Sequence, residues 1–124
     1  MRYFQDALYI KQSLSETSPM SLVMSMKNLA NAMRMNQNYQ KALSLYKEIV
    51  TMQLSDGTSS YFTDRDVGGS FHAIGNIHMQ LRQNNFAVKF FVKAFQHYRI
   101  SGVSKDDEIM IELKKSIKST RICR

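Results

Sequence analysis

Few side chains in this 124-residue chain combine the types and spacing that enzyme chemistry requires. His72 and His78 are six residues apart, so on one helix they point about 120° from each other. A helical zinc site instead pairs histidines four residues apart. Cys123 has no histidine partner at a fixed spacing, and the acids at 106–108 suit the first turn of a helix. The sequence contains no GxxxxGK[ST], GxGxxG or GxSxG motif. We therefore expect no enzymatic activity, no bound metal and no cofactor.

The composition is that of one globular domain, with 44% hydrophobic and 22% charged residues. Seventeen Lys and Arg against ten Asp and Glu give a net charge of +7. No apolar stretch reaches the ~18 residues of a membrane span, and the opening MRYFQDALYIKQ lacks the apolar core of a secretory signal. The single cysteine excludes an internal disulfide and fits a reducing compartment. We expect a cytoplasmic protein with no membrane partner.

Proline and glycine are scarce, and their positions separate segments with helical periodicity. Pro19 marks a helix start, and 56–60 is the clearest loop. Ser101-Gly102 ends one helix, and Ser104 is a plausible N-terminal cap of the next. No alternating strand pattern is present. The fold class is therefore expected to be all-α. The expected segments are 2–14, 19–36, 39–54, 65–83, 85–100 and 105–120.

The chain matches itself at a shift of 45 residues. Large, small and bulky apolar positions recur in both copies: Met26 with Phe71, Leu29 with Ile74, Ala30 with Gly75, Met33 with His78, Ala42 with Ala87, Tyr46 with Phe91, and Ile49 with Ala94. A second match, at a shift of 35, places 4–8 on 39–43. Gly75 and Ala87 would let paired helices approach closely. We expect Gly75 to tolerate alanine, because glycine is a poor residue in a helix interior, but not leucine, which would overpack the contact between the helices.

At these residues the sequence resembles the tetratricopeptide repeat (TPR) family, most closely the lengthened repeats of kinesin light chain. The resemblance implies antiparallel helix–turn–helix repeats stacked as a right-handed solenoid. It implies one TPR-like domain over 1–124, with a half repeat at 2–14, repeats at 19–54 and 65–100, and a terminal helix at 105–120. The surplus length falls in the 55–66 loop, and Asn84 stands where the family commonly has an aromatic residue. The incomplete end units suggest a piece of a longer array, and a compact independent domain is the alternative.

The resemblance also implies a function, because first helices of TPR units line a concave groove that binds peptides. The expected peptide-binding residues are Lys27, Asn28, Asn31 and Arg34 from the first full unit, His72 and Asn76 from the second, and Lys114 and Lys115 from the last helix. Asparagines can pair with peptide amides, and the cations favour carboxylates. Lys27 and Asn31 match half of the family's carboxylate clamp, but Ala73 replaces its second Asn. The expected partner is an extended, acidic peptide or protein.

Two other interpretations stay open for this chain. The basic residues between Lys114 and Arg124 suggest a nucleic-acid-binding protein, although the aromatic residues are expected in the repeat core. The Phe-rich segment at 86–95 suggests a self-assembling structural fragment, or else a helix buried on several sides. The methionines at 20, 24, 26, 33 and 35 suggest either core packing or an adaptable binding surface. His78 is expected to be a buried core residue rather than a ligand.

Overall fold

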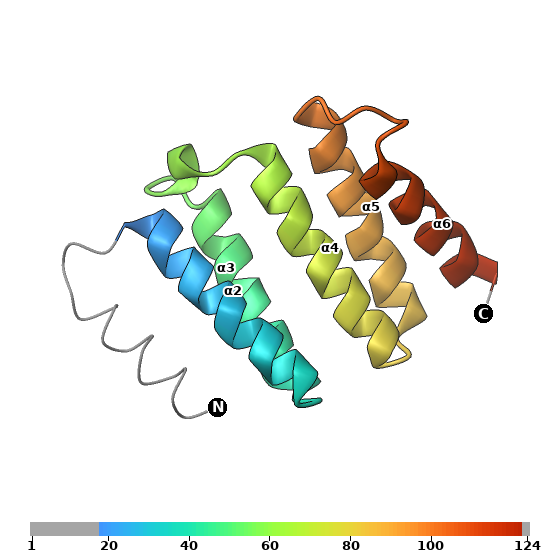
Figure 1. Ribbon diagram of the computed structural model, residues 1–124, viewed down its shortest axis with the longest axis horizontal. Coiled ribbons are helices and arrows are strands. Elements are labelled where there is room, and N and C mark those ends of the chain that lie inside the picture. The colour runs from blue at the N-terminus through green and yellow to red at the C-terminus, as the bar shows by residue number, and fades with distance from the viewer. Residues whose placement is uncertain (1–17, 123–124) are drawn as a thin grey trace. The chain divides into compact units, whose positions relative to one another are not determined.

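The computed structural model describes residues 18–122, which form five α-helices and one short 3-10 helix, with no strand in that range (Figure 1). The chain divides at Phe62 and Thr63 into two compact units. The first holds α2 (Pro19–Met35), α3 (Tyr39–Leu54) and η1 (Ser59–Tyr61). The second holds α4 (Asp64–Gln80), α5 (Asn84–Ile100) and α6 (Glu108–Ile122). The all-α prediction is confirmed for the described residues, and the expected segment at 2–14 lies outside them.

Side-chain caps mark the starts of α2 and α4. The Ser18 hydroxyl accepts a hydrogen bond from the Ser21 amide at 3.1 Å, and proline occupies the first position of α2. Before α4, the Thr63 hydroxyl accepts from the Asp66 amide at 3.1 Å, while the Asp66 carboxylate accepts from the Thr63 amide at 2.9 Å. This reciprocal capping box explains a start at Asp64.

The last helix begins at Glu108, three residues later than the expected start at 105. Ser104 does not cap it, because its hydroxyl accepts only from the Asp106 amide within a turn. The Asp107 carboxylate instead accepts from the Ile109 amide at 3.0 Å, and the Asp107 carbonyl accepts from the Met110 and Ile111 amides. Asp107 is therefore the N-terminal cap of this helix, and it places the first helical residue at Glu108.

The two helical hairpins have the same internal geometry at a spacing of 45 residues. Both ends of α4 lie 45 positions after the corresponding ends of α2. Gln37 and Arg82 occupy the same place in the two turns, with φ of 64° and 59°. The following amide donates to the carbonyl five residues back in each case, at 2.8 Å. These are Schellman turns, and their identity shows that the sequence repeat corresponds to a repeated helix–turn–helix.

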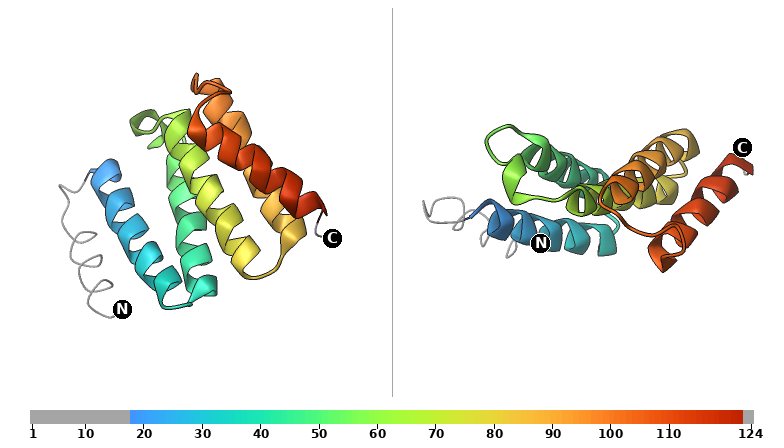
Figure 2. Two further views of the ribbon diagram at one scale, coloured as in Figure 1. Left: turned by 45° about the vertical axis from the view of Figure 1, so that its right-hand side comes forward. Right: turned by 90° about the horizontal axis from the view of Figure 1, so that it is seen from above.

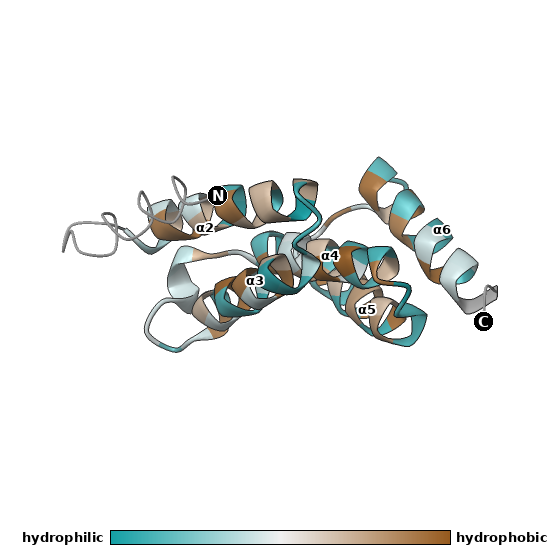
Figure 3. Cartoon of the chain, turned by 90° about the horizontal axis from the view of Figure 1, so that it is seen from below, coloured by the Kyte–Doolittle hydropathy of each residue, from teal (hydrophilic) through white to brown (hydrophobic). Residues whose placement is uncertain are grey.

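Each hairpin has its own core, formed where its two helices pack together. Colouring by hydropathy shows apolar and polar residues in separate bands along the helices (Figure 3), as amphipathic packing requires. In the second unit α6 also packs against α5 (Figure 2). The first core includes Met26, Leu29, Ala30, Met33, Ala42, Tyr46 and Ile49. The second includes Phe71, Ile74, Gly75, His78, Ala87, Phe91, Ala94, Met110 and Leu113.

Gly75 lies where α4 packs tightly against Phe91 and Ala87 of α5. A Cβ atom built on Gly75 would lie 2.7 Å from Cδ1 and from Cε1 of Phe91, and 3.3 Å from the Ala87 carbonyl oxygen. Phe91 is fully buried, so its ring has little room to move. The expectation that Gly75 tolerates alanine considered helix propensity alone, and this geometry argues against it.

Gly75→Ala should lower the free energy of unfolding by about 1–3 kcal/mol, because the added methyl group overpacks against Phe91. Helix propensity alone would instead raise it by up to ~1 kcal/mol. Denaturant titration followed by circular dichroism measures the difference. Gly57→Ala is the matched control, since nothing lies within 4 Å of a Cβ there. A Gly75→Ala variant as stable as the wild type would disprove the close contact.

Candidate protein-binding surface

One side of α2 carries all four binding residues expected from the first repeat. At about 100° per residue, these four and three methionines fall within about a third of the helix circumference. We call this surface the α2 outer face. It consists of Met20, Met24, Lys27, Asn28, Asn31, Arg34 and Met35. Its centre points away from the arc that the buried residues of α2 occupy, so the packing of α2 on α3 leaves it on the surface.

The methionines of α2 divide into two groups that serve different purposes. Met26 and Met33 are each 3% exposed, so the core interpretation is confirmed for them. Met20, Met24 and Met35 are 57%, 61% and 84% exposed. A row of exposed, flexible thioether side chains is an adaptable apolar surface. The sequence contained the signal, because Met20 and Met24 are four residues apart and Met35 follows Asn31 at the same interval.

The polar residues of the α2 outer face differ in how they are held. Lys27 and Asn28 have no hydrogen-bond or ion-pair partner in the described part of the chain, and Asn28 is exposed. The side-chain oxygen of Asn31 accepts a hydrogen bond from the Tyr46 hydroxyl of α3 at 2.8 Å. Arg34 is half-buried and lies close enough to influence Tyr46 electrostatically. Asn31 therefore supports the hairpin as well as the surface, which sequence reasoning missed.

The equivalent position in the second unit, Asn76, lacks such a bond. Phe91 replaces Tyr46 at the repeat-related position and has no hydroxyl. Asn76 is half-buried on α4 and makes no hydrogen bond within the described residues. Its amide therefore has donors and an acceptor available for a ligand.

The remaining expected residues lie on two helices of the second unit. His72 shares α4 with Asn76, and its ring packs edge-on against Phe91 and Tyr98 of α5 at centroid distances of 5.9 and 6.3 Å. Lys114 and Lys115 are exposed on α6, and the Lys114 ammonium lies 5.7 Å above the Phe95 ring. The structure thus groups His72 with Asn76 on α4, and Lys114 with Lys115 on α6.

His78 is buried, as the sequence predicted, at 5% exposure. Its Nδ1 lies 2.8 Å from the side-chain oxygen of Gln83, and its ring stacks between Phe86 and Phe90. No group of three or more His, Cys, Asp or Glu residues that could hold a metal ion occurs among the described residues. Across residues 18–122, no helix has the length and hydrophobicity of a membrane span.

Asn31→Ala should lower the free energy of unfolding by about 0.5–1.5 kcal/mol, because the buried Tyr46 hydroxyl loses its acceptor. Asn76→Ala should have a smaller effect, since no bond is lost. Denaturant titrations of both variants measure this difference between repeat-related positions. Equal effects would show that the Asn31–Tyr46 bond does not contribute to stability.

Stability should fall as the pH rises above about 10. Burial raises the pKa of the Tyr46 phenol, and the Arg34 guanidinium offsets only part of this. In the unfolded chain the Tyr46 phenol has its ordinary pKa near 10, so as the pH rises it loses its proton before the phenol of the folded state does. The contribution of Tyr46 is thus complete below pH 10 and is lost toward the higher pKa of the folded state.

Tyr46→Phe should flatten the fall in the free energy of unfolding above about pH 10, the ordinary pKa of a phenol. The exposed Tyr61→Phe is the matched control and should leave the profile unchanged. A Tyr46→Phe profile as steep as that of the wild type would contradict the assignment. Comparing the variants with the wild type removes every contribution to the pH profile that all three proteins share.

Comparison with known proteins adds no assignment. No protein-family model, curated protein or solved structure matches the chain.

Proposed function

We propose that this chain is a TPR-like protein-interaction module that binds an acidic, partly apolar segment of a partner protein on the α2 outer face. The observation that carries the proposal is the row of exposed methionines at 20, 24 and 35, interleaved with the side chains of Lys27 and Asn28, which have no partner among residues 18–122. The proposed role is binding rather than catalysis, in the cytoplasm, without a cofactor.

The repeated hairpin supports the TPR resemblance. Two helix–turn–helix units whose first helices have equivalent bounds and which share the same Schellman turn are what a helical-repeat architecture is built from. We extend this to a right-handed stack in which α2 and α4 contribute first helices to one groove. In that arrangement Asn76 and His72 would continue the surface that Lys27 and Asn28 begin.

The chemistry of the α2 outer face defines the partner. Exposed apolar side chains gathered on one face are uncommon on a monomer's surface and are typical of interaction sites. The methionines can repack around different apolar side chains. Lys27 and Arg34 make the face basic, and α2 contains no Asp or Glu. A segment with acidic residues beside apolar anchors therefore complements it in both charge and hydrophobicity.

Selection from a random peptide library displayed against the immobilised full chain tests the proposal. Enriched peptides should combine Asp or Glu with large apolar residues. Met24→Gln together with Lys27→Gln should weaken a selected peptide by about 1–3 kcal/mol, measured by calorimetry. The part that is due to Lys27 should shrink as salt is raised.

Lys41→Gln is the matched control, because Lys41 is an exposed lysine on the second helix of the same hairpin. It should bind the selected peptide as the wild type does. If no peptide is enriched, or if Lys41→Gln weakens binding while the α2 double variant does not, the α2 outer face is not the binding surface.

A further inference from the structure

The second unit contains a row of stacked rings between α4 and α5. In spatial order they are Phe86, His78, Phe90, Phe71 and His97. Successive ring centroids are 5.4, 5.3, 6.0 and 5.4 Å apart. The interplanar angles are all below 30°: 28°, 6°, 26° and 25°. At the far end His97 Nδ1 lies 2.9 Å from the Asp64 carboxylate. Each ring is thus fixed by its neighbours.

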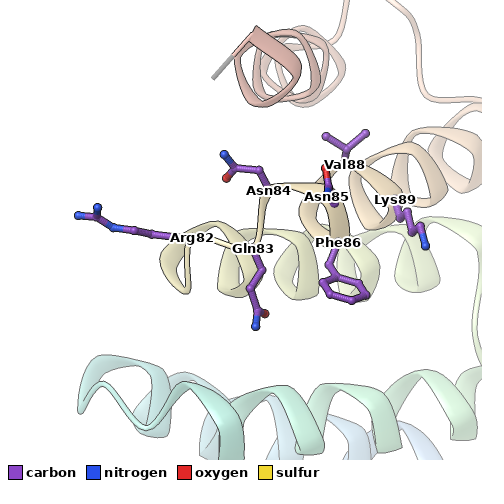
Figure 4. A pocket seen from close by; sticks show the side chains of 7 residues that line it. All are labelled: Arg82, Gln83, Asn84, Asn85, Phe86, Val88 and Lys89. Carbon is purple, nitrogen blue, oxygen red and sulfur yellow. The ribbon is translucent and has the colours of Figure 1, made fainter. Parts of the chain in front are cut away.

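The row ends at the surface with Phe86, which is 51% exposed. This corrects the expectation that the aromatic residues belong to the repeat core. Phe86 borders an open pocket at the α4–α5 turn, where Arg82, Asn85 and Lys89 also contribute lining side chains (Figure 4). The Lys89 ammonium lies 5.7 Å from the centre of the Phe86 ring.

The charge around this pocket has one sign. Residues 67–105 contain five Lys and Arg and no Asp or Glu. Arg82 and Lys89 are exposed residues of the pocket lining, and Lys93 lies 5.4 Å from the centres of both Phe71 and Phe90 farther along the row. Cations placed beside a flat exposed ring favour an anionic ligand that also has an aromatic face.

We infer that the Phe86 pocket binds single-stranded nucleic acid, with one base stacked on Phe86 and the adjoining phosphates contacting Arg82 and Lys89. An exposed cation–π contact is weak, so a base can displace the Lys89 ammonium from the ring toward a phosphate. Stacking on His78 holds the Phe86 ring before the ligand arrives, which lowers the entropy cost of binding.

The neighbouring amide favours a nucleobase over an acidic peptide. Asn85 is exposed and has no partner among the described residues, so it offers both a donor and an acceptor to a base edge. An acidic peptide would use the cations but would not need the flat ring. This site does not depend on the α2 outer face, which lies in the other unit.

Fluorescence anisotropy of a short labelled oligothymidylate with the full chain tests the inference. Phe86→Leu keeps an apolar side chain but removes the stacking surface, and it should weaken binding by roughly 5- to 100-fold. The Phe86→Leu variant should bind heparin, which has charge but no bases, as tightly as the wild type does. Arg82→Gln should instead reduce the dependence of binding on salt, by about one unit of logarithmic slope.

Phe95→Leu and Arg99→Gln are the matched controls on α5. Phe95 is also partly exposed under a lysine, Lys114, at 5.7 Å, and Arg99 is an exposed cation at the other end of the helix. Both variants should bind oligothymidylate like the wild type, and circular dichroism should show all four variants folded. No measurable binding, equal losses in Phe86→Leu and Phe95→Leu, or polyglutamate competing as well as oligothymidylate would each overturn the inference.

Discussion

The close approach of two helices within each hairpin is the contact on which the other features depend. In the second unit Gly75 permits it by leaving room for the Phe91 ring above the Ala87 backbone. In the first unit Ala30 and Ala42 are fully buried at the repeat-related positions, and Tyr46 replaces Phe91. Because interiors are closely packed, this contact fixes how each helix is rotated about its axis. The rotation then decides which residues face solvent.

The functional surfaces follow from that rotation together with the turn geometry. Placing Leu29 and Ala30 in the core directs Met24 and Lys27 outward from α2. Placing Phe91 in the core of the second unit leaves Phe86 at the mouth of the pocket beside the α4–α5 turn. The Tyr46–Asn31 bond and the stacked rings then hold particular side chains at these two surfaces.

The sequence predicted the helices well because local signals define them. Pro19 and Gly102 mark boundaries that the structure confirms, and the division between the units falls inside the expected 55–66 loop. The predicted start of the last helix at 105 is wrong, because α6 begins at Glu108. Ser104 and Asp107 are both suitable caps, and only the folded geometry distinguishes them. The exposure of Phe86 and the role of Asn31 depend on contacts between helices, which periodicity does not specify.

The nine methionines allow one direct test of the proposed function. With methyl-¹³C methionine in the full chain, addition of a selected acidic peptide should shift the methyl signals of Met20, Met24 and Met35. The signals of the buried Met26 and Met33 should change much less, because those side chains are fixed in the core. Shifts confined to Met79 and Met110 of the second unit, with the α2 signals unchanged, would contradict binding at the α2 outer face.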